Sequence, residues 1–292
     1  MRHLTKEMKV NIEDIEGTGK DGRVLKEDVH RHVANAAQDS QPHQQSSSSQ
    51  GPTKQVVGDR QMSLTPVQKA MFKTMTRSLT IPHFLYTSTI ETTGLTTLRK
   101  RLNNRLESGE KITPLPFILK AISLAFAHHP LLNASLDTTN SDKPILTYRS
   151  AHNFGIAVDT PSGLMVPVIR NIESLSVAEI ASKVRSISST AREGKLSSSD
   201  LQGATFSVSN IGSIGGGVVA PIIVEPQVAI VGVGRSRVVP AFNDAGEIVK
   251  REELVLSWSA DHRVVDGAEC ARCAERVRDY IENVDGWLLE LR

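Results

Sequence analysis

The chain has 292 residues, of which 39% are hydrophobic, so it is long enough for one large domain or for a large and a small one. Its formal net charge of +2 gives no reason to expect a nucleic acid or an anionic membrane as a partner. No apolar run approaches the roughly 20 residues that span a bilayer, and the first residues begin a charged helical pattern rather than a secretory signal. The only two cysteines, Cys270 and Cys273, fit a reducing compartment, and two thiols alone do not make a zinc site.

Residues 1–36 are predicted to form a small helical domain, with helices over Met1–Met8 and Leu25–Ala34 joined by a turn-rich loop. A unit of this size buries little apolar surface, so docking on another protein is its natural role. Residues 37–59 are rich in Gln, Ser, Pro and His, which predicts a flexible linker. We therefore expect residues 60–292 to form a separate, larger domain.

The larger domain mixes helices and strands that are joined by both hairpins and long crossovers, which predicts an α+β fold with a mixed sheet. Thr65 is a candidate N-cap for a helix that starts at Pro66. Further helices are expected over Thr93–Leu106, Pro116–Ala127, Ser176–Arg192 and Ala268–Val284. Strands are expected over Ile81–Ile90, Ile145–Tyr148, Asn153–Asp159, Met165–Ile169, Thr205–Asn210 and Val228–Val233, with turns at Thr160–Gly163 and Asn243–Gly246.

One histidine stands at a predicted strand-to-helix junction. Leu254–Trp258 alternates as a half-buried strand does, and Gly267 opens the next helix, so His262 falls between the two. An imidazole in such a place can move a proton at neutral pH. An Asp-His-Arg turn is also typical of a salt-bridged corner, and the residues alone leave both interpretations open.

A serine ends the strand that precedes a glycine-rich turn. Ser209 is followed by Gly212–Gly217, so its hydroxyl can project from the end of a sheet. The alternative for this residue is a buried strand serine. The surroundings of Ser209 do not match G-x-S-x-G, the pattern around the nucleophile of many serine hydrolases.

The stretch Ser257–Ala268, which runs Ser-Trp-Ser-Ala-Asp-His-Arg-Val-Val-Asp-Gly-Ala, resembles the D-H-R-x-x-D/N-G motif of the E2 components of 2-oxo acid dehydrogenase complexes. Ile81–Phe84, His152–Asn171 and Phe206–Gly216 match in the same order, so the resemblance covers nearly the whole chain. It is strongest to the branched-chain members of that family. It implies a chloramphenicol-acetyltransferase-like catalytic domain that acts as a trimer, preceded by an all-α peripheral-subunit-binding domain.

The same resemblance implies an enzyme that passes a branched-chain acyl group from dihydrolipoamide to coenzyme A. The lipoyl group is carried in this family on a domain that has no counterpart here. His262 takes the place of the base, Ser209 that of the hydroxyl that stabilises the oxyanion, and Asp266 that of an orienting residue. No metal is implied. The positions that match coenzyme A contacts are Arg99, Thr113, Asp159, Ser188, Ser209, Asn210, Gly234 and Ser236.

Partners and location are implied in the same way. Arg2, Lys6 and Arg23 match the basic residues that bind dihydrolipoamide dehydrogenase (E3) or, in some members, the 2-oxo acid dehydrogenase (E1), although Lys6 can equally be an ordinary surface charge. The implied assembly is a homotrimer that builds a 24-subunit core in a mitochondrial matrix or a bacterial cytoplasm. The apolar tail Trp287, Leu288, Leu289 and Leu291 is expected to insert into another subunit. An acetyl- or succinyl-transferring E2, or a non-catalytic scaffold that docks E3, are the alternatives.

Overall fold

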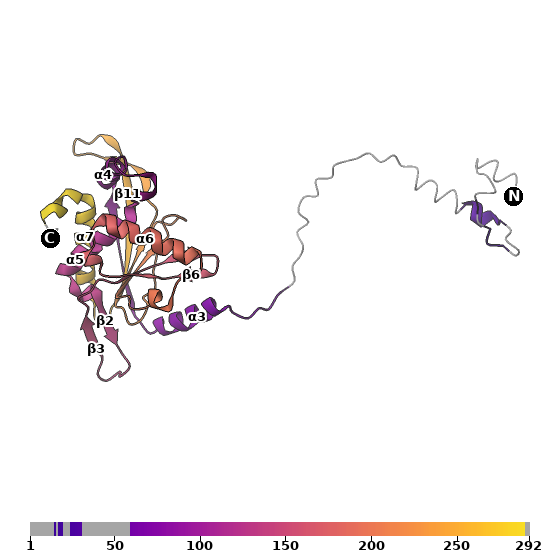
Figure 1. Ribbon diagram of the computed structural model, residues 1–292, viewed down its shortest axis with the longest axis horizontal. Helices are drawn as coiled ribbons and strands as arrows, with labels where there is room; N and C mark the ends of the chain where they lie inside the picture. Colours follow the sequence, from indigo (N-terminus) through magenta and orange to yellow (C-terminus); the bar gives the residue numbers. More distant parts are fainter. Residues whose placement is uncertain (1–14, 16, 20–23, 31–58, 290–292) are drawn as a thin grey trace. The chain divides into compact units, whose positions relative to one another are not determined.

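The computed structural model describes residues 15, 17–19, 24–30 and 59–289 of the chain (Figure 1). The chain divides into two compact units, Met1–Gln61 and Met62–Arg292. Among the described residues, none of the helices combines the length and the apolar character needed to cross a membrane. The predicted helix Met1–Met8 and the binding candidates Arg2, Lys6 and Arg23 lie outside the described residues.

In the first unit, a buried aspartate ties a loop to the start of a helix over residues 26–30. The Asp28 carboxylate accepts hydrogen bonds from the Thr18 N–H at 3.0 Å, from the Thr18 hydroxyl at 2.8 Å and from the Leu25 N–H at 2.9 Å. The next residue, Val29, is fully buried. A carboxylate that accepts several backbone N–H groups stabilises the first turn of a helix.

The second unit is built on a mixed sheet whose main path has the strand order β1-β11-β9-β8-β4-β7, with β10 paired to β11. Among the strand pairs of the described residues, β8–β9 and β4–β8 are parallel and the others are antiparallel. Two small antiparallel ribbons, β2–β3 and β5–β6, lie outside it. The strands are β1 His83–Glu91, β2 Ala134–Asp137, β3 Ile145–Tyr148, β4 Phe154–Ile156, β5 Val158–Thr160, β6 Gly163–Met165, β7 Val168–Ile169, β8 Phe206–Asn210, β9 Ala229–Val233, β10 Arg237–Phe242 and β11 Ile248–Asp261.

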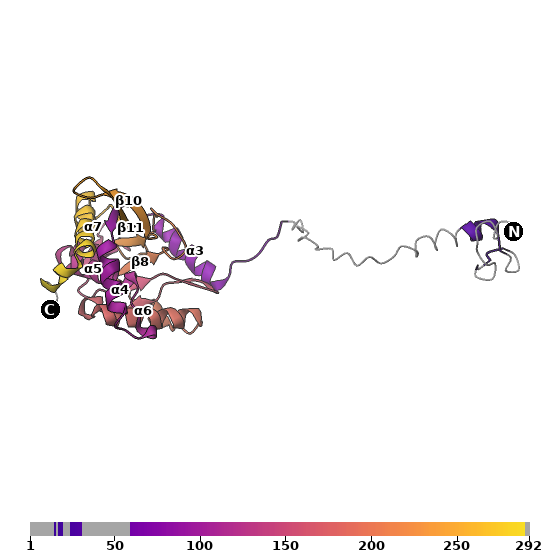
Figure 2. The same ribbon diagram turned by 90° about the horizontal axis from the view of Figure 1, so that it is seen from above.

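Four helices cover one face of this sheet, and α3 lies on its other side (Figure 2). Thr65 caps α3 as predicted, since its hydroxyl accepts the Gln68 N–H and the Gln68 side chain accepts the Thr65 N–H. The α-helices are α3 Pro66–Ser78, α4 Thr93–Asn103, α5 Pro114–His128, α6 Val177–Arg192 and α7 Gly267–Glu282. The 3₁₀ helices are η3 Ser108–Glu110, η4 Pro130–Asn133, η5 Ile172–Ser174, η6 Ser198–Leu201 and η7 Val284–Leu289.

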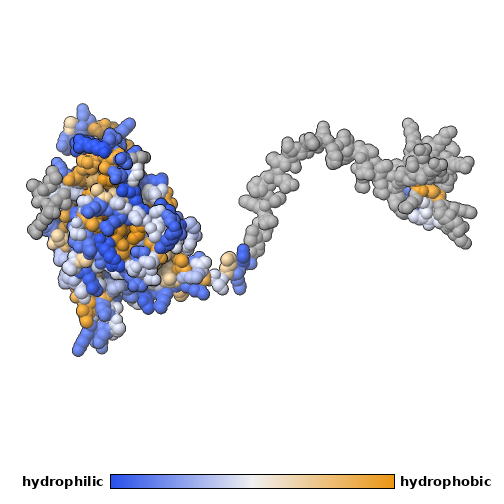
Figure 3. Space-filling view, viewed as in Figure 1, coloured by the Kyte–Doolittle hydropathy of each residue, from blue (hydrophilic) through white to orange (hydrophobic). Residues whose placement is uncertain are grey.

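Large apolar side chains are exposed at several places on this unit, and apolar areas interrupt the hydrophilic surface in Figure 3. Phe72 of α3 is 65% exposed and Leu79, just after it, is 82% exposed. Ile214 and Val218, in the segment between β8 and β9, are 73% and 63% exposed. Exposed apolar surface of this extent is typical of a chain that associates with other copies or partners.

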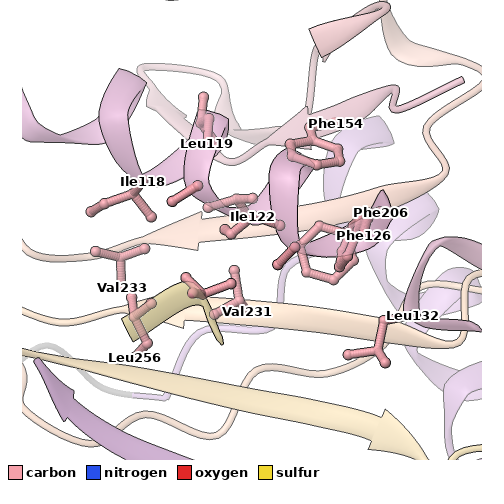
Figure 4. Packing of buried hydrophobic residues seen from close by; sticks show 14 of the residues in the cluster. Ile118, Leu119, Ile122, Phe126, Leu132, Phe154, Phe206, Val231, Val233 and Leu256 are labelled. Atoms are coloured by element: carbon pink, nitrogen blue, oxygen red, sulfur yellow. The ribbon is translucent and has the colours of Figure 1, made fainter. Parts of the chain in front are cut away.

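The two faces of the sheet differ in character. On the helical face, Phe126 of α5 packs edge to face on Phe206 of β8 with ring centroids 4.9 Å apart (Figure 4). The ring centroid of Trp258 on β11 lies 6.0 Å from that of Phe206. Side chains alternate along a strand, so Ser207, Ser209, Ser257 and Ser259 point to the other face. Among the described residues, Ile81, Ile223 and Ile230 form a small apolar cluster there. The helical face therefore supplies most of the hydrophobic stabilisation, and the face to which the four serines point is called the serine face below.

Three expectations differ from the structure. The strand predicted over Met165–Ile169 is divided between the end of β6 and the whole of β7, with residues 166–167 outside both strands. The strand predicted over Asn153–Asp159 is two strands, β4 and β5, because the Ile156 and Ala157 N–H groups bond to Pro167 and Val208 before the chain leaves the main sheet. Trp287 does not project toward another subunit: it is 4% exposed, its indole N–H donates to the Tyr280 carbonyl at 2.6 Å, and its ring packs on Phe117. For Trp287 the predicted insertion into another subunit is therefore wrong, because the ring is already buried in its own chain.

Candidate active site

His262 stands where the sequence predicts, directly after β11 and before α7. Its backbone N–H donates to the Pro82 carbonyl at 2.9 Å, and its ring lies against Phe84 with centroids 5.1 Å apart. The ring Nδ1 is 3.1 Å from the Val265 carbonyl oxygen. A carbonyl only accepts hydrogen bonds, so Nδ1 carries the proton and Nε2 is the unprotonated nitrogen of the neutral ring. The residue is exposed, so its ring can be reached from outside the chain.

The salt-bridged corner, the alternative for this turn, is also present, but it does not use the histidine. Asp261 is 1% exposed and pairs with Arg263 through Nε at 2.9 Å and Nη2 at 2.6 Å. These hydrogen bonds raise the pKa of Arg263, so it stays charged. A paired and hydrogen-bonded carboxylate is the form in which a buried charge is tolerated. The pair fixes the turn on both sides of His262 and leaves its imidazole outside the pair.

Asp266 begins helix α7. Its side chain accepts the Glu269 N–H at 2.8 Å, which makes it the N-cap. The residue before it is Val265, whose carbonyl holds the His262 ring. The cap thus fixes the backbone that sets the ring's orientation, in line with an orienting role. The next residue, Gly267, has no room for a side chain, because a Cβ there would lie 2.9 Å from Cζ of Phe84.

Ser209 lies near the end of β8 with a half-buried side chain. In the sheet it is level with Gly232 of β9 and Ser257 of β11, so the three face the same side. The Ser257 hydroxyl accepts the Val219 N–H at 3.2 Å. Val219 fits into the space over Gly232, where a Cβ would come within 2.2 Å of its Cγ2. The segment after Ser209 is therefore held down on the serine face of the sheet.

Within one chain, Ser209 and His262 lie far apart. Ser209 is level with Ser257, whereas His262 follows Asp261, two strands away and four residues further along β11. With strands about 4.8 Å apart and a rise of about 3.3 Å per residue, the Cα atoms of Ser209 and Asp261 are roughly 16 Å apart. No hydrogen bond or shared substrate atom can join the two side chains over that distance.

Four of the candidate coenzyme A positions lie at or just after the carboxyl ends of β8 and β9, which are parallel and therefore end on the same side of the sheet. Two of them shape the backbone: the Asn210 side chain accepts the Gly212 N–H at 3.1 Å, and a Cβ on Gly234 would lie 2.4 Å from the Gly217 carbonyl. Arg235, which the sequence did not single out, donates to the Gly212 carbonyl at 3.2 Å. Its own N–H bonds to the Gly216 carbonyl. The four positions at these strand ends are Ser209, Asn210, Gly234 and Ser236.

The other candidates come from separate elements. Arg99, on α4, has a buried Nε without a hydrogen-bond partner among the described residues, a donor that suits an acidic or carbonyl ligand group. Thr113 precedes α5, and Ser188 lies on α6 three residues after Arg185. Arg185 donates to carbonyls of the loop before α5, which brings these two elements together. Asp159 is exposed on β5, a strand that packs near α6. No cluster of metal-ligating side chains occurs among the residues that the structure describes.

Residues 57–289 match the family of 2-oxoacid dehydrogenases acyltransferase (catalytic domain), and residues 2–30 match the e3 binding domain. The chain belongs to the 2-oxoacid dehydrogenase acyltransferase family. This membership confirms the resemblance inferred from the Asp-His-Arg motif.

Among curated relatives, the chain is 38% identical to the mouse (Mus musculus) mitochondrial lipoamide acyltransferase component of the branched-chain alpha-keto acid dehydrogenase complex. That match covers 100% of this chain and 64% of the relative, so the chain spans somewhat less than two thirds of the relative's length.

Among solved structures, dihydrolipoamide acetyltransferase of Azotobacter vinelandii superposes with a TM-score of 0.73 at 33% identity, over 82% of this chain and 97% of that one. The cubic core of a pyruvate dehydrogenase multienzyme complex matches with a TM-score of 0.73 at 32% identity and the same coverage. The predicted fold class, an α+β catalytic domain of the E2 type, is thereby confirmed.

Proposed function

We propose that the chain is an acyltransferase that moves a branched-chain acyl group from dihydrolipoamide to coenzyme A. The observation that carries the proposal is the tautomer of His262, whose Nδ1–H is held by the Val265 carbonyl so that Nε2 is the base. A thiol with a pKa near 8.5 is mostly protonated at neutral pH, and thiol attack on a thioester needs such a base.

The reaction follows from these groups. Nε2 of His262 takes the proton from the coenzyme A thiol as its sulfur attacks the acyl carbon of the thioester. The Ser209 hydroxyl donates to the oxygen that becomes negative in the tetrahedral intermediate. When the intermediate collapses, the dihydrolipoamide sulfur leaves with the bonding electrons and takes the proton back from Nε2. Asp266 orients the ring through the cap of α7 and transfers no proton.

The working site is formed between two copies of the chain. By strand geometry Ser209 lies roughly 16 Å from Asp261, the residue before His262, so a site that uses both Ser209 and His262 must draw them from neighbouring subunits. The exposed apolar side chains of α3 and of the segment between β8 and β9 are suited to such an interface. A trimer that builds a 24-subunit core is the proposed assembly, supported by the cubic core among the similar structures.

Coenzyme A is proposed to lie across the carboxyl ends of β8 and β9, where Ser209, Asn210, Gly234 and Ser236 gather. Arg99, whose Nε has no hydrogen-bond partner in the described part of the chain, and Thr113, Asp159 and Ser188 complete the proposed set. The lipoyl group is expected to arrive on a separate domain.

The branched-chain preference is supported by the mouse relative, whereas the solved Azotobacter vinelandii structure is an acetyltransferase. That structure concerns a serine, a histidine and an asparagine in the catalytic mechanism, the asparagine four positions after the histidine. Here Asp266 stands four positions after His262. The test is transfer from a panel of acyl coenzyme A species to free dihydrolipoamide: we expect isobutyryl and isovaleryl groups to be preferred. Preference for acetyl or succinyl groups would assign the chain to those alternatives.

The proposed domains are a subunit-binding module over residues 1–36, a linker over 37–59 and the catalytic domain over 60–292. The module would dock E3, and also E1, through Arg2, Lys6 and Arg23, in a mitochondrial matrix or a bacterial cytoplasm. Arg23→Ala should weaken E3 binding measured by calorimetry and leave acyl transfer intact. A non-catalytic scaffold is the second candidate: it would bind E3 and show no transfer with any acyl donor.

A further inference from the structure

The histidine that opens β1 uses both of its ring nitrogens on backbone groups. Nδ1 of His83 lies 2.8 Å from the Ile81 carbonyl oxygen, and the Ile223 N–H donates to Nε2 at 3.0 Å. The carbonyl can only accept and the N–H can only donate, so His83 is neutral with its proton on Nδ1. Only a side chain with a donor and an acceptor in this geometry can make both bonds.

The residues on either side of His83 hold His262. The carbonyl of Pro82 accepts the backbone N–H of His262 at 2.9 Å, and the ring of Phe84 lies against the His262 imidazole. His83 itself is level with Asp261 in the β1–β11 pair. The backbone and the ring of His262 are therefore both located by the short stretch of chain that His83 fixes.

The other end of this connection is buried and hydrogen-bonded. Ile223 is fully buried, and its carbonyl accepts the hydroxyl of Ser78 at 2.7 Å. Ile223 packs with Ile81 and Ile230 in the small apolar cluster on the serine face. The His83 ring thus joins the start of β1 to a buried point of the segment that leads from β8 to β9.

We propose that His83 is a positioning residue for acyl transfer, which holds the Pro82 carbonyl and the Phe84 ring so that Nε2 of His262 meets the substrate thiol. The inference rests on the proposed function, and it gives His83 no contact with the substrates. A displacement of about 1 Å in a reacting group can cost on the order of 100-fold in rate, so small shifts of this stretch should be visible in kcat.

The test compares three variants of the full chain with the wild type, in acyl transfer from isovaleryl coenzyme A to dihydrolipoamide. His83→Phe keeps a ring and loses both hydrogen bonds, His83→Asn keeps a donor near the Nδ1 position, and His83→Gln offers an acceptor near the Nε2 position. We expect His83→Phe to lower kcat per folded site by roughly 10- to 100-fold. His83→Asn and His83→Gln should each lose less kcat than His83→Phe. The KM for coenzyme A should change little, because neither His83 nor the stretch that it holds belongs to the proposed coenzyme A contacts.

His128→Phe, at the end of α5, is the control for loss of an exposed histidine elsewhere. Folded sites are counted from the assembled fraction by light scattering. Unchanged kcat per folded site in all three His83 variants, with only a smaller folded fraction, would overturn the inference and leave the proposed function standing. A wild-type chain that transfers no acyl group would overturn both.

Discussion

If His262 and Ser209 of a working site come from different subunits, two inactive variants should restore each other. His262→Ala should lose nearly all turnover, and Ser209→Ala should lose on the order of 10² to 10³ in rate, the usual effect of removing one oxyanion donor. When the two variants are refolded together in equal amounts, each site draws its histidine from one chain and its serine from a neighbour. About a quarter of the sites then contain both intact groups, since each group is intact with a chance of about one half.

The expected rate is about a quarter of the wild-type rate per site, far above the average of the two pure variants. Refolding the wild type with the double variant His262→Ala/Ser209→Ala is the matched control. For shared sites this mixture also gives about a quarter of the wild-type rate, whereas sites within one chain give about half. Native mass spectrometry verifies that subunits have mixed. A complementing mixture that stays at the average of the pure variants would refute the argument from strand register.

Three further predictions concern the folded chain. Gly232→Ala should lower the free energy of unfolding in urea by about 1–3 kcal/mol, because the new Cβ meets Val219. Adding Val219→Ala should recover most of this loss. A double variant as unstable as the single one would contradict the contact. Burial lowers the pKa of His152 in the folded chain below its ordinary value near 6.5. Below that pH the unfolded chain binds a proton more readily than the folded chain, so protonation favours unfolding. The urea midpoint should therefore fall as the pH drops below that value, and less steeply in His152→Asn. Burial raises the pKa of Cys270 to about 12 and that of Cys273 well above its usual value, so neither should react with iodoacetamide until the chain unfolds, which mass spectrometry would show.

The helices were predictable because local signals mark them. The capping box at Thr65 fixes the start of α3, and the apolar run of α5 identifies a helix buried on nearly all sides. The short strand β2 was missed, since its residues are buried without alternation over most of its length. The exit of the chain at Ala157 depends on a hydrogen bond to Val208, some fifty residues later, which no local pattern reveals.

In the candidate site, too, the sequence predicts what depends on local patterns and does not predict what depends on contacts between distant residues. The motif was enough to place His262 at a junction, but its tautomer depends on the Val265 carbonyl and its backbone on Pro82. The separation of Ser209 from His262 follows only from the strand register. The burial of Trp287 depends on contacts with Phe117, far away in the sequence.

The cap at Asp266 limits which residues the sequence can carry at this position. An N-cap needs only a side-chain oxygen that accepts a backbone N–H, and Asn and Asp serve about equally well. An exchange of one for the other therefore costs little folding stability, yet it adds or removes a full negative charge one residue from the carbonyl that holds the His262 ring. At this position selection can tune the electrostatic surroundings of His262 almost independently of the fold, which makes it a natural first place to change the pH range of the proposed acyl transfer.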